Sequence, residues 1–142
     1  MKYVSGLFAL NLPCSLNTTG DWHRTSLPWD KVEIKDSDKS PLKDFGIEKN
    51  IYIDELNANY NVANHIRACV DILDEGRYTL VSGMRYDFFD NNEDIIPDLF
   101  NCVFSLKSQK TQKEWESISQ IMEKDYMLKW IVFLQEKNNG TI

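Results

Sequence analysis

Apolar residues recur at steps of three and four from about Tyr60 onward, which is the period of an amphipathic α-helix. Each such helix buries only one side, so several of them must pack against one another or against a sheet. The pattern predicts four helical segments, at 60–76, 78–89, 93–106 and 111–137. We therefore expect a fold whose C-terminal part is dominated by helices.

Glycine, proline and capping residues mark where these segments begin, bend or end. Gly76 is a typical C-terminal stop for the first segment, and Gly83 is expected to bend or interrupt the second. Pro97 allows the third segment to begin after its acidic first residues. The fourth begins with the capping-box pattern of Thr111 and Glu114. Its buried face is expected to contain Trp115, Ile118, Met122, Tyr126, Trp130 and Phe133.

The N-terminal part of the chain lacks this period. Residues 2–10 are apolar and fit either a strand or a short helix, whereas 11–30 have the Pro, Gly, Asn and Thr content of a loop. Trp22 and Trp29 lie in this loop, and two large indole rings are expected to pin it to the body of the protein. Two short strands are expected at 31–35 and 51–53. We predict one α+β domain over 1–142, mostly helical, with four or so C-terminal helices and a small N-terminal β element.

The charge balance narrows the classes of function. The 142 residues carry 16 Lys and Arg against 22 Asp and Glu, a formal net charge of −6. Proteins that bind duplex nucleic acid gain affinity by neutralising phosphates with cationic side chains, so we expect no duplex partner. An acidic surface favours a basic protein partner, or simply solubility.

No segment of the sequence indicates export or a membrane. No run approaches the roughly 18 apolar residues of a membrane-spanning helix. Lys2, the apolar stretch after it and Cys14 resemble a lipoprotein leader, but Asn11 interrupts the apolar run and Pro13 stands where a small residue is needed. We expect a cytoplasmic protein.

Three cysteines are present, and no two of them have the CxxC spacing of a zinc ribbon or a redox pair. Cys69 and Cys102 are expected to be reduced thiols in the core, and Cys14 a reduced thiol of the N-terminal loop. No HxH or HExxH pattern predicts a metal site, and no glycine-rich phosphate loop predicts a nucleotide. We expect neither a metal nor a cofactor.

The first candidate site is the loop segment that contains Asn17, Thr19, Asp21, Trp22 and His23. A carboxylate near an imidazole fixes the tautomer of the ring and raises its basicity, as Asp21 would do for His23. Cys14 would complete a Cys/His/Asp set of the kind that activates a thiol nucleophile. The alternative is a plain turn, in which Gly20 has a positive φ and Trp22 is an anchor.

The second candidate site lies at the start of the first predicted helix. Asn61 and His65 are four residues apart and would share one face of that helix, and Arg67 would pair with Asp71. In one interpretation His65 is a buried histidine that holds the N-terminal loop by a hydrogen bond. In the other, His65 and His23 meet and form a polar site.

The third candidate is Arg85, which stands between apolar residues. Its guanidinium would either clamp a carboxylate or phosphate, or form an internal salt bridge with an acid such as Asp87. The neighbouring acids Asp87, Asp90, Glu93 and Asp94 more often mark a solvated loop and a helix start than a metal cluster.

Four stretches of the sequence resemble a family of small bacterial proteins, some of them encoded near nucleotidyltransferase-like genes. These stretches are Ser5–Asn11, Thr19–His23, Asn61–Arg67 and Gly83–Arg85, so the resemblance covers most of the chain. It implies an antitoxin-like or accessory protein that engages another protein. The resemblance carries over no catalytic residue.

Three hypotheses of function follow, and the sequence leaves open whether the protein is an enzyme. The first is a cytosolic binding protein that engages a basic or nucleotidyltransferase-like partner through its acidic surface and the N-terminal loop from Trp22 to Trp29, whose aromatic rings would be exposed. The second is a small enzyme in which a histidine is the general base, with a polar pocket formed by His23, His65, Asp21 and Arg85. The third is an oligomeric module that associates through the last helix, around Ile131 and Leu134.

Overall fold

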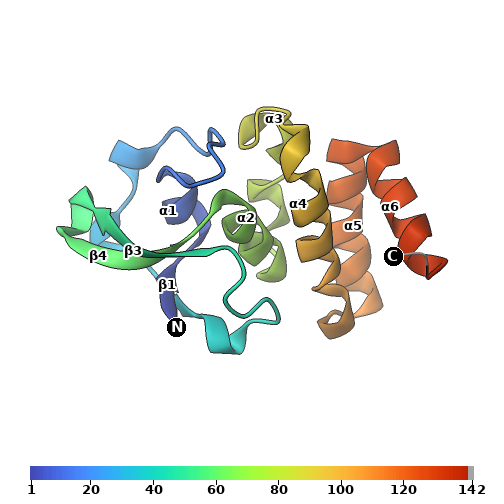
Figure 1. Cartoon of the computed structure of the whole chain (residues 1–142), viewed down its shortest axis with the longest axis horizontal. Helices are drawn as coiled ribbons and strands as arrows, with labels where there is room; N and C mark the ends of the chain where they lie inside the picture. The colour runs from blue at the N-terminus through green and yellow to red at the C-terminus, as the bar shows by residue number, and fades with distance from the viewer. Residues whose placement is uncertain (141–142) are drawn as a thin grey trace.

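The computed structural model describes residues 1–140, and its fold is α+β and mostly helical, as predicted. A four-stranded sheet lies at one end of the molecule, and the C-terminal helices lie at the other (Figure 1). The strands are β1 (Lys2–Val4), β2 (Ile34–Asp36), β3 (Ile47–Ile53) and β4 (Ala58–Ala63). The α-helices are α1 (Gly6–Leu10), α2 (His65–Asp74), α3 (Met84–Asp87), α4 (Ile96–Phe104), α5 (Gln112–Tyr126) and α6 (Leu128–Asn138).

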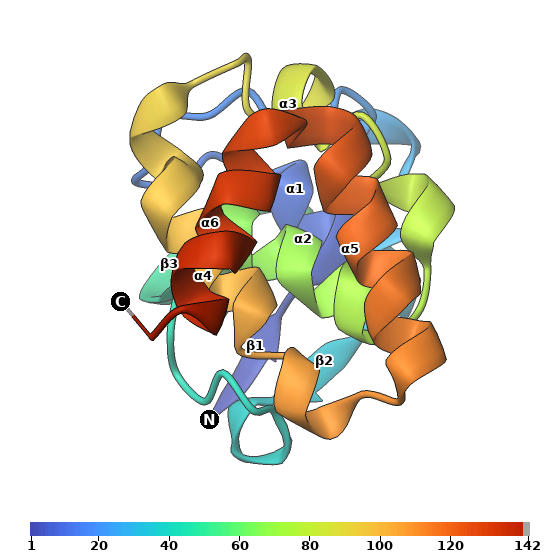
Figure 2. The same ribbon diagram turned by 90° about the vertical axis from the view of Figure 1, so that its right-hand side faces the viewer.

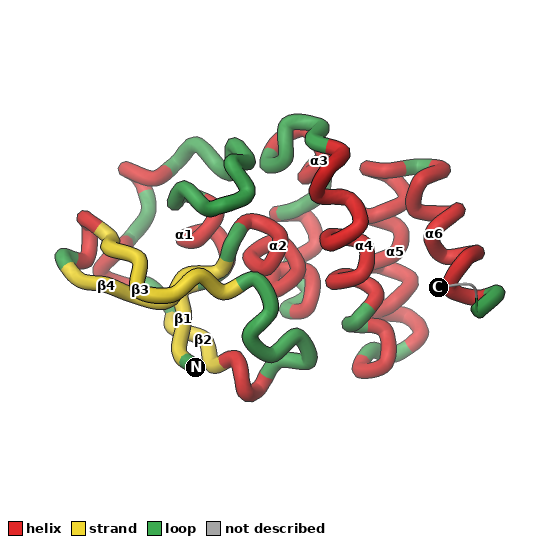
Figure 3. Tube along the Cα trace, in the orientation of Figure 1, coloured by secondary structure: helices red, strands yellow, loops and turns green. Residues whose placement is uncertain are grey.

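The sheet joins strands from distant parts of the chain in the order β2-β1-β4-β3. β1 is antiparallel to β2 and parallel to β4, and β3 and β4 form an antiparallel hairpin. Figure 3 shows these strands together, with the loops of the N-terminal half around them. The apolar segment 2–10, which fits either a strand or a helix, contains both, because β1 ends at Val4 and α1 begins at Gly6.

The strand β4 occupies residues that were predicted to begin a helix, and this prediction is wrong. Asn61 lies in β4, while His65 is the first residue of α2, so the two do not share a helix face. β4 pairs with the distant strand β1 on one side and with β3 on the other, and this pairing within the sheet overrides the apolar spacing on which the prediction rested. The helix begins after Asn64, whose side chain accepts a hydrogen bond from the backbone N–H of Arg67.

The helix α2 is the centre of the fold. Every residue from His65 to Leu73 is buried, and the helix lies between α1 on one side and α4 on the other (Figure 1). Cys69 of α2 and Cys102 of α4 are both buried, as predicted. Because α2 is buried on all sides, the side chain of His65 at its N-terminus has a defined position.

The longest predicted helix is in fact two helices. The capping box of Thr111 and Glu114 is present at the start of α5, but the chain turns at Met127, which has φ 52° and ψ −125°. The helices α5 and α6 lie side by side as a hairpin (Figure 2). The residues predicted to form one buried face still pack together on both sides of the turn. The ring centroids of Tyr126 in α5 and Trp130 in α6 each lie 5.1 Å from that of Phe100 in α4.

The two shorter predicted helices begin later than expected. Tyr78–Leu80 is a 3-10 turn, Gly83 with φ 93° interrupts the segment, and only α3 follows as α-helix. Glu93–Ile95 is likewise a 3-10 turn, and Pro97 stands in the first turn of α4. Proline is favoured there because the first N–H groups of a helix have no intrahelical partner.

Candidate functional site

The loop that follows α1 is fixed at its backbone. The N–H of Gly20 donates to the carbonyl oxygen of Phe88 at 2.9 Å, and the N–H of Asp21 donates to that of Leu10 at 2.8 Å. The hydroxyl of Thr19 also donates to the carbonyl of Phe88 at 3.1 Å. The loop is therefore bound to α1 and to the segment after α3, and its apex has a defined position.

The two tryptophans of this loop have opposite roles, so the expectation that both pin it is wrong. Trp29 is buried, lies edge-on to Phe8 at 5.0 Å between ring centroids and donates its indole N–H to the carbonyl of Arg24 at 2.8 Å. Trp22 is 80% exposed. The backbone bonds on either side of Trp22 hold the loop without its indole, which is presented to solvent.

A compact polar cluster stands beside Trp22. Asp21 accepts from the amide of Asn11 at 3.2 Å and lies 2.9 Å from Nδ1 of His23, whose backbone N–H donates to Asn11 Oδ1 at 2.8 Å. Partial burial raises the pKa of Asp21, but the Trp22 N–H, the Asn11 amide and His23 outweigh it and lower that pKa. The ionised carboxylate of Asp21 accepts a hydrogen bond from Nδ1–H of His23. In the neutral ring this leaves Nε2 as the nitrogen that can accept a hydrogen bond from another molecule. The predicted Asp21–His23 pair is therefore confirmed.

His65 is the buried histidine that holds this loop. Its Nε2 lies 2.7 Å from the carbonyl oxygen of Leu12, and its Nδ1 lies 2.5 Å from the hydroxyl oxygen of Thr18. The interpretation in which His65 ties the loop to α2 is confirmed. The interpretation in which His65 and His23 meet is wrong, since one ring is buried against Leu12 and Thr18 and the other is 69% exposed beside Asp21.

Cys14 is also placed differently from the Cys/His/Asp set considered above. Its sulfur lies 3.7 Å from the hydroxyl of Thr18, which contacts His65, whereas the ring of His23 is paired with Asp21. The thiol therefore belongs with the buried histidine and not with the exposed one. Thr18, which the sequence did not single out, stands between them.

Arg67 is a structural residue, and its predicted pair with Asp71 is confirmed. The two lie at 3.0 Å inside the fold, and Tyr3 donates to the other carboxylate oxygen at 2.6 Å. The guanidinium also donates to Tyr3 and to the carbonyls of Lys43 and Phe45. Arg67 thus ties α2 to β1 and to the 40–46 turn, and its buried charge is compensated within the fold.

Arg85 does not form the expected salt bridge with Asp87. The guanidinium is buried, donates to Asn91 Oδ1 at 2.8 Å and to the carbonyl of Asp125 at 3.2 Å, and lies 5.4 Å from the ring centroids of Tyr86 and Tyr126. An internal role is favoured over an anion clamp because amide, carbonyl and aromatic groups already surround it.

The remaining predicted residues make local contacts. Asn61 bridges strands, accepting from the N–H of Asn50 and donating to the carbonyl of Lys2, both at 3.2 Å. Asn17 has a positive φ of 57° in an exposed turn. The acids Asp87, Asp90, Glu93 and Asp94 are exposed, and within residues 1–140 no group of three or more His, Cys, Asp or Glu is arranged to hold a metal ion.

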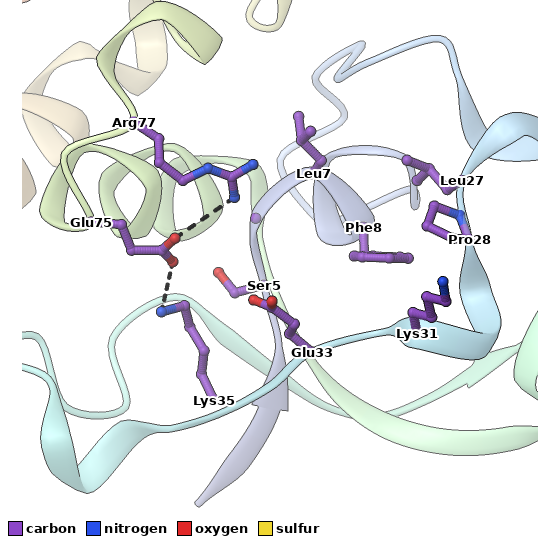
Figure 4. A pocket seen from close by; sticks show the side chains of 11 residues that line it. Ser5, Leu7, Phe8, Leu27, Pro28, Lys31, Glu33, Lys35, Glu75 and Arg77 are labelled. Carbon is purple, nitrogen blue, oxygen red and sulfur yellow. Dashed lines mark ion pairs between the residues drawn. The ribbon is translucent and has the colours of Figure 1, made fainter.

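A cavity of about 290 Å³ lies between α1, the end of α2 and residues 27–35, and no sequence pattern indicated it (Figure 4). Its lining combines apolar side chains, such as Phe8 and Leu27, with charged ones. Among the charged residues, Glu75 pairs with Lys35 at 2.7 Å and with Arg77 at 3.7 Å, as the dashed lines in Figure 4 mark. These residues come from distant segments, so only the fold brings them together.

A wider apolar groove, of about 640 Å³, lies between α4 and α6. Its most exposed apolar residues are Leu128 and Val132, whereas Ile131 and Leu134, on which the oligomer hypothesis rested, are half-buried. Self-association through α6 stays a prediction, for which sedimentation of the purified protein is the direct measurement.

No helix among the described residues is long and apolar enough to cross a membrane. Comparison of the chain with family models, with curated proteins and with solved structures finds no match.

Proposed function

We propose that this protein is a non-catalytic binding protein that engages another protein through the Trp22 surface, which consists of Trp22, His23 and the exposed residues Asn17 and Thr19. The observation that carries the proposal is the 80% exposure of Trp22 on a loop whose backbone is bonded on both sides. The resemblance of the sequence to antitoxin-like or accessory proteins supports the same class of function.

An exposed tryptophan leaves a large apolar area in water, which is unfavourable in an isolated protein but provides binding energy when a partner covers the ring. Tryptophan is among the residue types that dominate binding energy when they enter a partner's pocket, because the indole ring buries a large area. The fixed loop adds to this, since a surface that is already ordered loses little conformational entropy on association. His23 beside it offers a ring nitrogen for a directional hydrogen bond.

The charge of the chain supports a basic partner. The formal net charge of −6 steers cationic surfaces toward the protein and raises the rate of association. A nucleotidyltransferase-like protein encoded beside this one is the partner that the sequence resemblance favours. We place the complex in the cytoplasm, in line with three cysteines that form no disulfide among themselves.

The alternative of a small enzyme has less support. His23, His65 and Arg85 each have their own partners, and no two of them are paired with one another. A shared catalytic pocket requires one member of the set to act as base on a substrate that another member holds, and His23, His65 and Arg85 do not converge in that way.

The test is co-expression of the tagged protein with the genes that flank its own, followed by titration of the purified partner. Trp22→Ala is expected to weaken binding about 30-fold, the equivalent of about 2 kcal/mol. The matched control is Tyr52→Ala, which removes an aromatic ring that is 53% exposed on β3. Equal affinities of the two variants, or no partner among the flanking gene products, would reject the proposal.

A further inference from the structure

Cys14, Thr18 and His65 form a continuous chain of polar groups under the loop. The sulfur of Cys14 lies 3.7 Å from the hydroxyl oxygen of Thr18, and this oxygen lies 2.5 Å from Nδ1 of His65. His65 is buried, whereas Cys14 is partly exposed between the exposed residues Pro13 and Ser15. One end of the chain is therefore accessible from solvent and the other is enclosed.

The partners of His65 determine the direction of these hydrogen bonds. The carbonyl of Leu12 can only accept, so Nε2, at 2.7 Å, carries the ring proton. When the ring is neutral, Nδ1 is then an acceptor and the hydroxyl of Thr18 donates to it. The oxygen of Thr18 is left to accept from the thiol of Cys14, so the chain runs from thiol to hydroxyl to imidazole.

We propose that Cys14 is a nucleophilic thiol, that His65 is its base acting through Thr18, and that the site takes low-molecular-weight disulfides. In this role His65 and Thr18 are positioning residues, and the sulfur of Cys14 is the reacting atom.

The surroundings of Cys14 favour its thiolate. Partial burial raises the pKa of the thiol, but the His65 side chain and the backbone N–H groups of His65 and Leu16 outweigh it and lower that pKa. The N–H of His65 belongs to the first residue of α2, where helix N–H groups stabilise negative charge.

The same contacts favour the imidazolium that proton transfer would create. Burial lowers the pKa of His65, but Cys14, the Leu12 carbonyl and the charge of Glu48 outweigh it and raise that pKa. Glu48 of β3 is held beside the site by the N–H of Ser15 at 2.9 Å and its hydroxyl at 2.6 Å. An opposite pair of shifts of this kind is typical of an activated thiol and its base.

The other two cysteines lack this environment and serve as internal controls. Cys69 is fully buried, and desolvation raises the pKa of its thiol well above the ordinary value. Desolvation also raises the pKa of the Cys102 thiol, to about 12. Neither thiol is available to react with Cys14, since both lie in the core between α2 and α4.

The reaction is a thiol–disulfide exchange. The proton of Cys14 passes through Thr18 to Nδ1 of His65, and the thiolate attacks one sulfur of the small disulfide. A new S–S bond forms to Cys14, the original S–S bond breaks, and the departing thiolate carries away the electron pair of that bond. The proton stays on the imidazolium of His65 until it is lost to solvent, and the released thiolate is protonated by water. Since no second accessible cysteine stands nearby, the product is a mixed disulfide that persists until an external thiol reduces it.

The experiment follows the reaction of the folded protein with a neutral dipyridyl disulfide, whose released thiopyridone absorbs light. The wild type is expected to release one equivalent rapidly, with a pH profile centred below the roughly 8.5 of an ordinary thiol. Cys14→Ser should abolish this phase while Cys69 and Cys102 stay unreacted. Mass spectrometry of the mixed disulfide should place it on Cys14.

Two further variants test the role of the chain. His65→Gln keeps an amide for the Leu12 carbonyl but removes the base, and should slow the reaction at neutral pH about tenfold and move its profile to higher pH. Thr18→Val should act in the same direction, and Thr18→Ser should restore the wild-type profile. If His65→Gln does not fold, the comparison of Thr18→Val with Thr18→Ser tests the proposal by itself. A wild-type profile centred at or above that of an ordinary thiol, or one that neither variant moves, would overturn the proposal.

Discussion

The backbone of Gly20 passes directly over the imidazole ring of His65. A Cβ atom at Gly20 would lie 2.8 Å from Cε1 of the ring and would also overlap the carbonyl oxygen of Leu10. Gly20 has φ 67°, in the left-handed region that favours glycine. The loop that presents Trp22 can approach α2 this closely only because residue 20 has no side chain.

Gly20→Ala is therefore expected to lower the free energy of unfolding by about 3 kcal/mol, from a strained φ and a backbone overlap together. Urea denaturation followed by circular dichroism measures it. The matched control is Gly140→Ala, since Gly140 also has φ 67° but, its chain neighbours aside, no atom of residues 1–140 lies within 4 Å of its Cβ position. A cost at Gly20 no larger than at Gly140 would show that the close approach to His65 does not constrain the loop.

Arg67→Met is expected to lower the free energy of unfolding by about 3–5 kcal/mol, because it leaves the buried carboxylate of Asp71 without its cation. Chemical denaturation again provides the measurement. Arg24→Met is the comparison, as Arg24 pairs with Glu55 at 2.6 Å near the surface, where an ion pair contributes at most about 1 kcal/mol. Similar losses in the two variants would contradict the structural role of Arg67.

The stability of the loop should depend on pH through Asp21. The pKa of this carboxyl is lowered in the folded protein, so its ionised form is favoured by folding. The stability that it contributes is present above the unfolded pKa of roughly 3.9 and is lost as pH falls through the lower folded pKa. Asp21→Asn should therefore be less stable than the wild type at neutral pH, and the difference should narrow in acid.

Urea midpoints from neutral pH down to about pH 3 give this comparison. Asp90→Asn, a change of an exposed acid, is the control and should leave the wild-type pH dependence intact. A constant difference between Asp21→Asn and the wild type across this range would mean that Asp21 is not preferentially ionised in the fold.

Local patterns in the sequence predicted much of this structure. The helical C-terminal part, the capping box of Thr111 and Glu114, and the Arg67–Asp71 pair all depend on residues three or four apart, and each is confirmed. The role of His65 in holding the N-terminal loop was predicted as one of two alternatives, since a lone histidine on an apolar helix usually has a structural hydrogen bond.

The features that sequence reasoning missed depend on contacts between distant segments. β4 forms because β1 and β3 flank it, and residues 58–63 alone do not indicate this. Thr18 contacts His65, which is 47 residues away in the sequence. Through Thr18, Cys14 is connected to His65 and not to His23, the histidine nearest to it in the sequence. The sequence also does not distinguish Trp22, which is exposed, from Trp29, which is buried, because both lie in the same loop and the difference arises from packing.

Met127 separates α5 from α6, and no sequence pattern indicated this interruption of the predicted long helix. Its φ of 52° and ψ of −125° match the first central position of a type II′ turn, where glycine is preferred. Its side chain is exposed, so removing it loses little buried area. Met127→Gly is therefore expected to raise the free energy of unfolding by about 1 kcal/mol by relieving this backbone strain.

The control for this change is Met127→Ala, which removes the side chain but keeps a Cβ atom at the strained position. If strain is the cause, Met127→Ala should not be more stable than the wild type, and only the glycine variant should show a higher urea midpoint at an unchanged slope. Equal gains in both variants would instead trace the effect to the exposed methionine side chain. A loss in the glycine variant would mean that the freedom glycine adds to the unfolded chain outweighs the strain at the turn between α5 and α6.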